Sequence, residues 1–178
     1  MDFASFKDHL AARAPRAMQA LRPPAQEADM QRLRGTLRCE LSADLAATLQ
    51  ECDGASEPNG RFLPGSYRLL GCDEIVEQYV MLNTLLDELG ESMVGYWWHP
   101  EWVPFATHIA SDCLFVDMRE GEDHGRIGEF RHEDHADGIW SSFAVMLHEV
   151  AQALQSGRAV REYVPTVVEG ELAWEWAD

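Results

Sequence analysis

Residues 73–90 carry the most regular hydrophobic pattern in the chain. Apolar side chains recur at steps of four and three, as on one face of an α-helix, at Ile75, Tyr79, Leu82, Leu86 and Leu89. Asp73 stands where a residue can cap the first turn, and Gly90 stands where a helix commonly ends. The pattern therefore predicts one long amphipathic helix over this range.

Two shorter helical patterns precede it, at 4–21 and 26–33. Pro23 and Pro24 separate them, because proline cannot continue a helix, and Pro15 disfavours an unbroken first helix.

Two more helices are predicted at 43–52 and in the apolar stretch that follows Gly138. Serines that can cap them stand at Ser42 and at Ser141 or Ser142, and glycines that can end them stand at Gly54 and Gly157. The residues at 53–65 are rich in Gly, Pro, Asn and Ser, so we expect a loop there.

Residues 96–132 follow a different pattern, dense in aromatic and β-branched side chains and interrupted by Pro and Gly. We predict a meander of short antiparallel strands with a hairpin loop at 120–125. The run 113–118 is apolar at nearly all of its positions, odd and even, as expected for a central strand that is covered on both faces. Pro104 confines its own strand to an edge or a bulge. A last hairpin is predicted within 163–176, with its turn at Glu169-Gly170.

The 178 residues include 14 basic and 31 acidic side chains, for a net charge of −17. So few cations argue against a direct nucleic-acid binder and against an anionic membrane surface as partner. No apolar stretch suits a signal peptide or a membrane span, and the four cysteines form neither a Cys-x-x-Cys pair nor a disulfide framework. We therefore expect a soluble, cytoplasmic chain of one domain with free thiols.

The charge is unevenly distributed. Residues 1–38 carry a net charge of +3, and 39–178 carry −20. We expect a basic, helical amino-terminal segment, 1–38, that lies partly on an acidic domain, 39–178. At the end of the predicted helix at 73–90, Asp87, Glu88 and Glu91 stand where the helix dipole is negative, at a cost of about 0.3–1 kcal/mol each. We therefore expect something other than helix stability to favour these acids.

The richest set of possible metal ligands lies at 124–137 and includes His124, Glu129, His132 and His135. Imidazole and carboxylate groups suit zinc, iron or manganese, so a metal-dependent hydrolase is one hypothesis. However, His132 and His135 are three residues apart rather than the four of a helical zinc motif, and a solvated acidic hairpin explains the same residues. His148 likewise lacks a second histidine four positions later, where Gln152 stands. We treat His148 as a partly buried or flanking residue of its helix.

Other kinds of active site find no support in the sequence. There is no Gly-x-Ser-x-Gly elbow and no glycine-rich phosphate loop. Cys113 follows Asp112, whose charge raises a thiol pKa, so burial explains this cysteine better than catalysis does. We predict no catalytic residues and no cofactor.

Aromatic residues and acids that are interleaved form the candidate binding site. Its members are Trp97, Trp98, Trp102, Asp112, Asp117, Glu120, Glu122, Asp123, Glu133 and Asp134. Large rings dominate the energetics of protein interfaces, and surrounding charges set the rate of association and the choice of partner. The alternative is that the tryptophans belong to the core and the acids form a solvated rim.

The stretch Trp102-Val-Pro-Phe-Ala-Thr-His-Ile-Ala-Ser-Asp-Cys-Leu-Phe-Val-Asp117 resembles the signature of the SMI1/KNR4 superfamily, also called SUKH. The segments at 41–54, 67–75 and 140–147 resemble other elements of that family, in the same order, so the resemblance covers 41–157. Ser111 and Ser42 depart from the Gly and Pro that are frequent at those family positions.

This resemblance implies an α+β fold in which a central, mainly antiparallel (mixed) sheet packs against helices. It also implies a non-enzymatic protein-binding role, because many bacterial members resemble immunity proteins that neutralise a toxin. An acidic body suits a basic partner such as a nuclease toxin. A regulatory or scaffold protein of the same fold remains an alternative, and the oligomeric state stays open.

Overall fold

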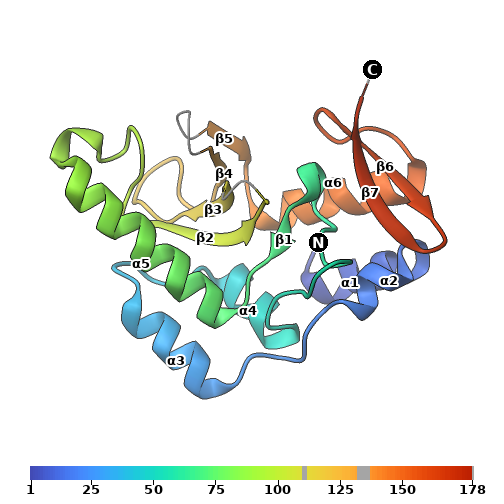
Figure 1. Ribbon diagram of the computed structural model, residues 1–178, viewed down its shortest axis with the longest axis horizontal. Coiled ribbons are helices and arrows are strands. Elements are labelled where there is room, and N and C mark those ends of the chain that lie inside the picture. The colour runs from blue at the N-terminus through green and yellow to red at the C-terminus, as the bar shows by residue number, and fades with distance from the viewer. Residues whose placement is uncertain (110–111, 132–136, 178) are drawn as a thin grey trace.

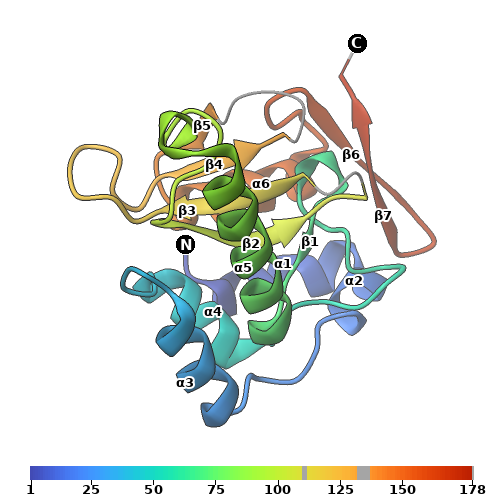
Figure 2. The same cartoon turned by 60° about the vertical axis from the view of Figure 1, so that its left-hand side comes forward.

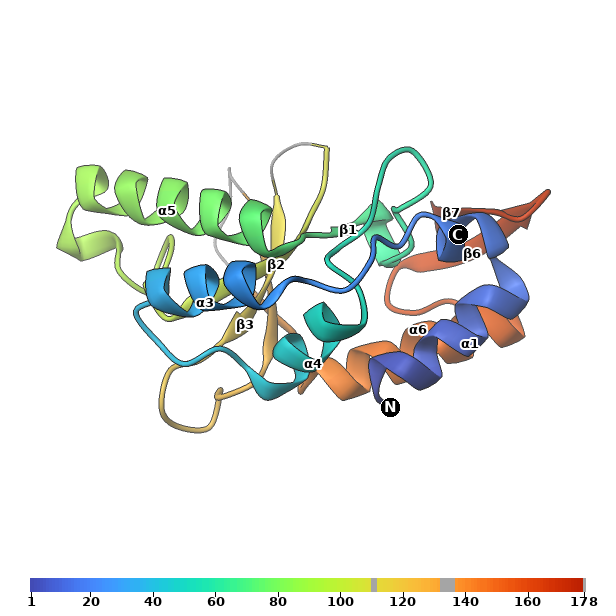
Figure 3. The same ribbon diagram turned by 90° about the horizontal axis from the view of Figure 1, so that it is seen from below.

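The computed structural model describes residues 1–109, 112–131 and 137–177. Its centre is a five-stranded sheet in the order β1-β2-β3-β4-β5, in which every neighbouring pair is antiparallel. The strands are β1 (Arg68–Leu69), β2 (Trp102–Thr107), β3 (Cys113–Asp117), β4 (Ile127–Phe130) and β5 (Asp137–Trp140). Helix α5 (Cys72–Leu89) covers one face of this sheet, and α6 (Phe143–Ser156), flanked by α1 (Phe3–Arg13), covers the other (Figures 1 and 3). The predicted α+β fold with a mainly antiparallel sheet is confirmed.

The two faces of the sheet bury different side chains, because successive residues of a strand point to opposite sides. Val103 and Phe105 belong to the larger core, where the Phe105 ring lies 5.1 Å from that of Phe143 on α6. Trp102 and Phe115 belong to a smaller core beneath α5. Strand β3 is buried along its whole length, as expected for a central strand.

Pro104 stands at an irregularity of β2, where the register with β3 shifts between Pro104 and Ala106. The expected bulge is therefore present, and it accommodates a residue that has no N–H to donate.

Helix α5 matches its prediction except at its first turn. Gly71 rather than Asp73 is the N-cap, and the Glu74 carboxylate accepts a hydrogen bond from the Gly71 amide at 2.9 Å. The helix ends at Gly90, whose positive φ of 94° suits glycine. Asp73 is thus a first-turn residue and not the cap.

Helix α6 is capped as predicted. The Ser142 hydroxyl accepts a hydrogen bond from the Val145 amide at 3.2 Å, and Gly157 ends the helix with a φ of 68°. Helix α4 (Ala43–Glu51) also begins after a serine, but the side chain of Ser42 makes no capping hydrogen bond. Gly54 lies beyond the end of α4, where Cys52 is the C-cap.

The amino-terminal helices are α1, α2 (Pro15–Gln19) and α3 (Glu27–Thr36). The single helix predicted at 4–21 is therefore wrong, because Pro15 starts a new helix after Ala14, whose φ of −136° is not helical. Helix α3 also continues to Thr36, past the predicted 33. Buried side chains of α1 and α3, such as Phe6 and Leu33, belong to the same core as the sheet.

Two strand predictions also need correction. Residues 96–98 do not form a strand, because backbone hydrogen bonds such as Trp97 N to Met93 O (2.9 Å) and Gly95 N to Trp98 O (2.8 Å) fold them into a turn. Strand β5 was not predicted, since Gly138 suggested a break. Instead, Gly138 pairs with Gly128 of β4.

The carboxy-terminal hairpin consists of β6 (Tyr163–Val168) and β7 (Glu171–Trp176), with the predicted turn at Glu169 and Gly170. Trp174 is buried and donates its indole N–H to the Phe62 carbonyl at 3.1 Å. Trp176, two residues further along β7, is exposed. The core extends only as far as Trp174.

Five of the seven basic side chains of the amino-terminal segment pair with acids at 39–178. The ion pairs are Lys7–Glu51, Arg16–Glu171, Arg22–Glu74, Arg32–Asp73 and Arg38–Asp87. These ion pairs join the basic segment to the acidic domain, as the charge asymmetry of the sequence suggests. They also neutralise positive charge that the surface would otherwise display.

Glu74 offers a test of this arrangement. Burial alone would raise the pKa of Glu74, but hydrogen bonds from Arg68, the Gly71 amide and Arg22 outweigh it and hold the pKa below its usual value. A group with a lowered folded pKa stabilises the fold above its unfolded pKa of about 4.3, and this contribution is lost as the pH falls through the folded pKa. Glu74→Gln should therefore lower the free energy of unfolding at pH 7 by about 1–2 kcal/mol, less at acidic pH.

Urea unfolding at a series of pH values measures this difference. Glu77→Gln is the matched control, because Glu77 is exposed on the same helix and should change stability little. A loss for Glu74→Gln that stays constant from pH 7 to pH 3 would contradict the role of its charge.

Candidate functional site

The candidate residues meet at one end of the sheet. Trp102 begins β2 and Asp117 ends β3, and the two are register partners. The turn that precedes β2 and the loop at 118–126 that follows β3 therefore lie at the same end. Figure 2 shows this loop projecting from the sheet. A cleft of about 180 Å³ lies here, and its lining includes Gly95, Trp102, Asp117, Arg119, Asp123 and Arg126.

The tryptophan rings face the interior of the protein. Trp98 is fully buried and Trp102 is 4% exposed, with its ring stacked on Phe115 at 4.4 Å. Trp97 is half-buried, and its ring lies edge-on to Phe130 at 5.1 Å. Trp98 and Trp102 are therefore core residues, as the alternative interpretation of the sequence proposed. Their place in the site is to support the cleft from below.

Asp117 and Arg119 form the best-ordered ion pair of the site. The Asp117 carboxylate is buried and accepts from the Arg119 guanidinium at 2.6 and 3.0 Å and from the Arg119 amide at 3.0 Å. This hydrogen bonding raises the pKa of the Arg119 guanidinium, which also lies over the Trp102 ring at 5.4 Å. The pair anchors the start of the loop, since removing one partner would leave a buried charge uncompensated.

The acids of the loop occupy two environments. Asp123 binds Arg126 at 2.6 Å and approaches Arg119, so its charge is largely compensated. Glu120 and Glu122 are exposed at the tip of the loop, and within the described ranges no ion pair includes them. These two carboxylates are the ones available to a partner.

Of the three remaining candidate acids, the structure describes one, and it lies apart from this cluster. Asp112 precedes β3 and so lies at the opposite end of the strand from Asp117. Glu133 and Asp134 lie outside the described residues. The binding site predicted from the sequence is therefore only partly assembled, around Trp102, Asp117 and the loop.

The metal hypothesis gains nothing from the part of the chain that the structure describes, where no three His, Cys, Asp or Glu side chains are placed to hold an ion. Glu129 accepts hydrogen bonds from the Tyr67 hydroxyl at 2.8 Å and from Arg131 at 2.9 Å. Burial, together with Glu129, raises the pKa of the Tyr67 hydroxyl. His124 is exposed, and His132 and His135 lie outside the described residues.

Neither His148 nor the thiols offer a catalytic group. His148 is exposed on α6 rather than partly buried. All four cysteines are free, and burial raises the pKa of Cys52 to about 11 and that of Cys113 still further, with Asp112 adding to the latter shift. Such thiols stay protonated at neutral pH and are poor nucleophiles.

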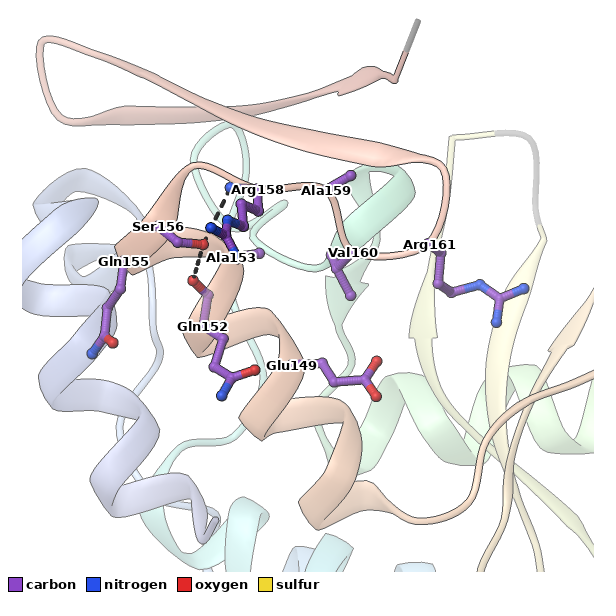
Figure 4. A pocket seen from close by; sticks show the side chains of 9 residues that line it. All are labelled: Glu149, Gln152, Ala153, Gln155, Ser156, Arg158, Ala159, Val160 and Arg161. Atoms are coloured by element: carbon purple, nitrogen blue, oxygen red, sulfur yellow. Dashed lines mark hydrogen bonds between the residues drawn. The ribbon is translucent and has the colours of Figure 1, made fainter.

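A larger pocket, of about 630 Å³, lies between the second half of α6 and the segment at 158–161 (Figure 4). Glu149 in this pocket accepts the indole N–H of Trp140 at 2.8 Å. Arg161 donates to the Ile139 carbonyl at 2.9 Å and points to one side in Figure 4, away from Arg158. The polar groups of this pocket do not converge on a common point, so we assign it no ligand.

Sequence reasoning missed Tyr96. It is 67% exposed, whereas Trp98, two residues later, is completely buried. The strand predicted there would have placed both side chains on one face. Instead, these residues follow Gly95, whose φ is 77°, in a turn that leaves the Tyr96 side chain exposed and the Trp98 side chain buried.

Comparison with known protein families identifies the family of this chain. The family model described as SMI1 / KNR4 family (SUKH-1) matches residues 24–149. The match contains α3 to α5 and the whole five-stranded sheet, and it leaves out α1, α2 and the carboxy-terminal hairpin. No curated protein matches the chain. None of the described helices is both long enough and apolar enough to span a membrane.

Proposed function

Because the chain belongs to the SMI1/KNR4 family (SUKH-1), which is known for immunity proteins, we propose that it is an immunity protein that neutralises a basic toxin in the cytoplasm. In this proposal it acts by binding and not by catalysis, and the family supports that general kind of role. The toxin is a protein with a cationic active surface, such as a nuclease.

The observation that supports the proposal most directly is that most of the positively charged side chains are already paired with carboxylates of the same chain. In the described part of the chain, every Lys and Arg side chain except Arg13, Arg158 and Arg161 pairs with a carboxylate. Many carboxylates remain exposed outside these ion pairs, among them Glu88 and Glu120. The surface field is therefore strongly negative, and it accelerates encounter with a basic protein while disfavouring direct contact with nucleic acid.

Co-expression with the toxin encoded by the neighbouring gene tests the proposal. The chain should restore growth of cells that produce the toxin, and it should form a stable complex with a catalytically inactive toxin variant. The association rate should fall at least tenfold between about 20 and 500 mM salt, because screening shortens the range of the attraction. A neighbouring gene that encodes no toxin, or a toxin that neither binds the chain nor is neutralised by it, would refute the proposal.

The tip of the loop at 118–126 provides a finer prediction. Glu120→Gln with Glu122→Gln should slow association several-fold and change dissociation little, since exposed rim charges act mainly on the association rate. Stopped-flow mixing with the inactive toxin measures both rates. Glu169→Gln with Glu175→Gln is the control, because it makes the same change in net charge on the hairpin outside the family match. Equal slowing by both pairs would show that net charge alone matters.

A further inference from the structure

Helix α5 and the turn after it expose several large apolar side chains. The exposed side chains are Val80 (48%), Met81 (43%), Leu89 (50%), Val94 (43%) and Tyr96 (67%). They make up half of the exposed large apolar side chains in the described part of the chain. Figures 1 and 3 both show the second half of α5 and this turn extending to one end of the molecule, beyond the other helices. Apolar side chains gathered in this way mark an interaction surface.

Acids surround this apolar face. Glu77, Glu88 and Glu91 are exposed, and in none of the ion pairs between described residues does any of them take part. Asp87 is also exposed, with Arg38 3.9 Å away. The last turn of α5 contains no basic residue, so Glu88 and Glu91 lie at the negative end of the helix dipole, outside the ion pairs of the described residues. A cation supplied from outside the chain would relieve this repulsion.

Buried side chains and a backbone hydrogen bond support this face from inside the protein. Leu82 and Leu86, which precede Leu89 on the inner side of α5, are buried with Trp98 and Trp102 in the smaller core. Tyr96 stands on the turn whose backbone is closed by the hydrogen bond from Gly95 N to Trp98 O. A rigid aromatic side chain loses little conformational entropy on binding, which favours tyrosine as an anchor in protein interfaces.

We infer that the toxin docks on this surface, the α5 docking face, formed by Met81 and Leu89 of α5 and by Val94 and Tyr96 of the turn, beside the acids Glu77, Glu88 and Glu91. The inference rests on the proposed function and adds the surface and the chemistry of its partner. The occupant is a basic protein surface that presents Lys or Arg side chains around an apolar patch. Apolar contacts bury Met81 and Tyr96, and the cations pair with the acids.

Charge decides between this occupant and its competitors. A second copy of the chain would bring the same acids against each other, and an anionic lipid surface would be repelled. A pocket of about 330 Å³ adjoins the face and shares Glu77 and Met81 with it. Its lining also contains Arg68, which pairs with Glu74, so Glu77 is the carboxylate of this lining that stands outside the ion pairs of the described residues.

Affinity measurements with the catalytically inactive toxin from the neighbouring gene test the docking face. Tyr96→Ala should weaken binding about 30-fold, as for an interface hot spot, and Tyr96→Ala with Met81→Ser should weaken it further, mainly through faster dissociation. Val168→Ser with Trp176→Ala is the matched control, because these side chains are as exposed but lie on the carboxy-terminal hairpin. The control should retain the wild-type affinity within about threefold.

The outcomes separate the two proposals. If the Tyr96/Met81 variant binds and neutralises the toxin as well as the wild type does, the docking face is wrong and the immunity function stands. If the wild type itself does not bind the toxin, the proposed function fails and the occupant named here fails with it. A wild-type dimer that the Tyr96/Met81 variant dissociates would also overturn the inference, because the face would then serve a second copy. Circular dichroism melting confirms that each variant is folded.

Discussion

Trp98→Ala is expected to lower the free energy of unfolding by about 3–5 kcal/mol, close to the whole stability of many small domains. The Trp98 ring is fully buried and lies edge-on to Trp102 at 5.5 Å, to Phe115 at 5.7 Å and to Phe130 at 5.4 Å. Its removal leaves a cavity between α5 and the sheet, which the surrounding rings can fill only in part. Urea unfolding monitored by circular dichroism measures the loss.

Two companion variants define what this loss means. Tyr96→Ala changes an exposed side chain of the same turn and should alter stability by no more than about 0.5 kcal/mol. Trp98→Phe keeps an aromatic ring and removes an indole N–H that finds no acceptor among the described residues, so it should cost much less than Trp98→Ala. Equal losses for Trp98→Ala and Tyr96→Ala would place the two rings in the same environment, against the structure.

The contrast between Tyr96 and Trp98 shows where sequence reasoning ends. Both residues lie in an aromatic run, and composition alone cannot tell a strand from a turn when Gly and Pro stand close by. The helix α5 was predictable because its apolar positions repeat over four turns. The turn at 91–100 has no repeat of its own, and its shape depends on contacts with α5 and β4 that are distant in sequence.

The same reason explains the other differences. Strand β3 could be recognised because it is apolar on both faces, and the hairpin β6–β7 because Glu169-Gly170 marks its turn. Strand β5 is short, contains Gly138 and depends on pairing with β4, which no local pattern records. Asp112 and Asp117 looked equivalent in the sequence, but one stands before β3 and the other ends it, so only Asp117 reaches the cleft.

The candidate site and the α5 docking face are mechanically connected through the smaller core. Trp102 lines the cleft and stacks on Phe115, and both contact Trp98 beneath α5. A disturbance at the ring of Phe115 should therefore reach the loop at 118–126 on one side and α5 on the other. Interiors transmit such strain because they are close-packed.

Gly128→Ala is expected to produce this disturbance and to destabilise the fold by about 3 kcal/mol or more, as overpacking of a filled core does. A Cβ at Gly128 would lie 2.1 Å from Cζ of Phe115 and 2.6 Å from its Cε1. Trp102 is stacked on the Phe115 ring at 4.4 Å and hinders its movement on that side. The strand must shift, and the Trp102 and Trp98 rings must shift with it.

Gly138→Ala is the matched control, since Gly138 is the register partner of Gly128 on β5. The three atoms nearest to a Cβ there belong to the guanidinium of Arg126, at 2.5 Å, which is the end of a flexible, exposed side chain that can move aside. The lower chain entropy of the unfolded alanine variant offsets this small cost, so Gly138→Ala should remain within about 1 kcal/mol of the wild type. Urea unfolding of both variants decides the matter. Equal stabilities would mean that Phe115 is not held in place by Trp102, and the cleft would then lack the rigid floor on which a preformed binding surface depends.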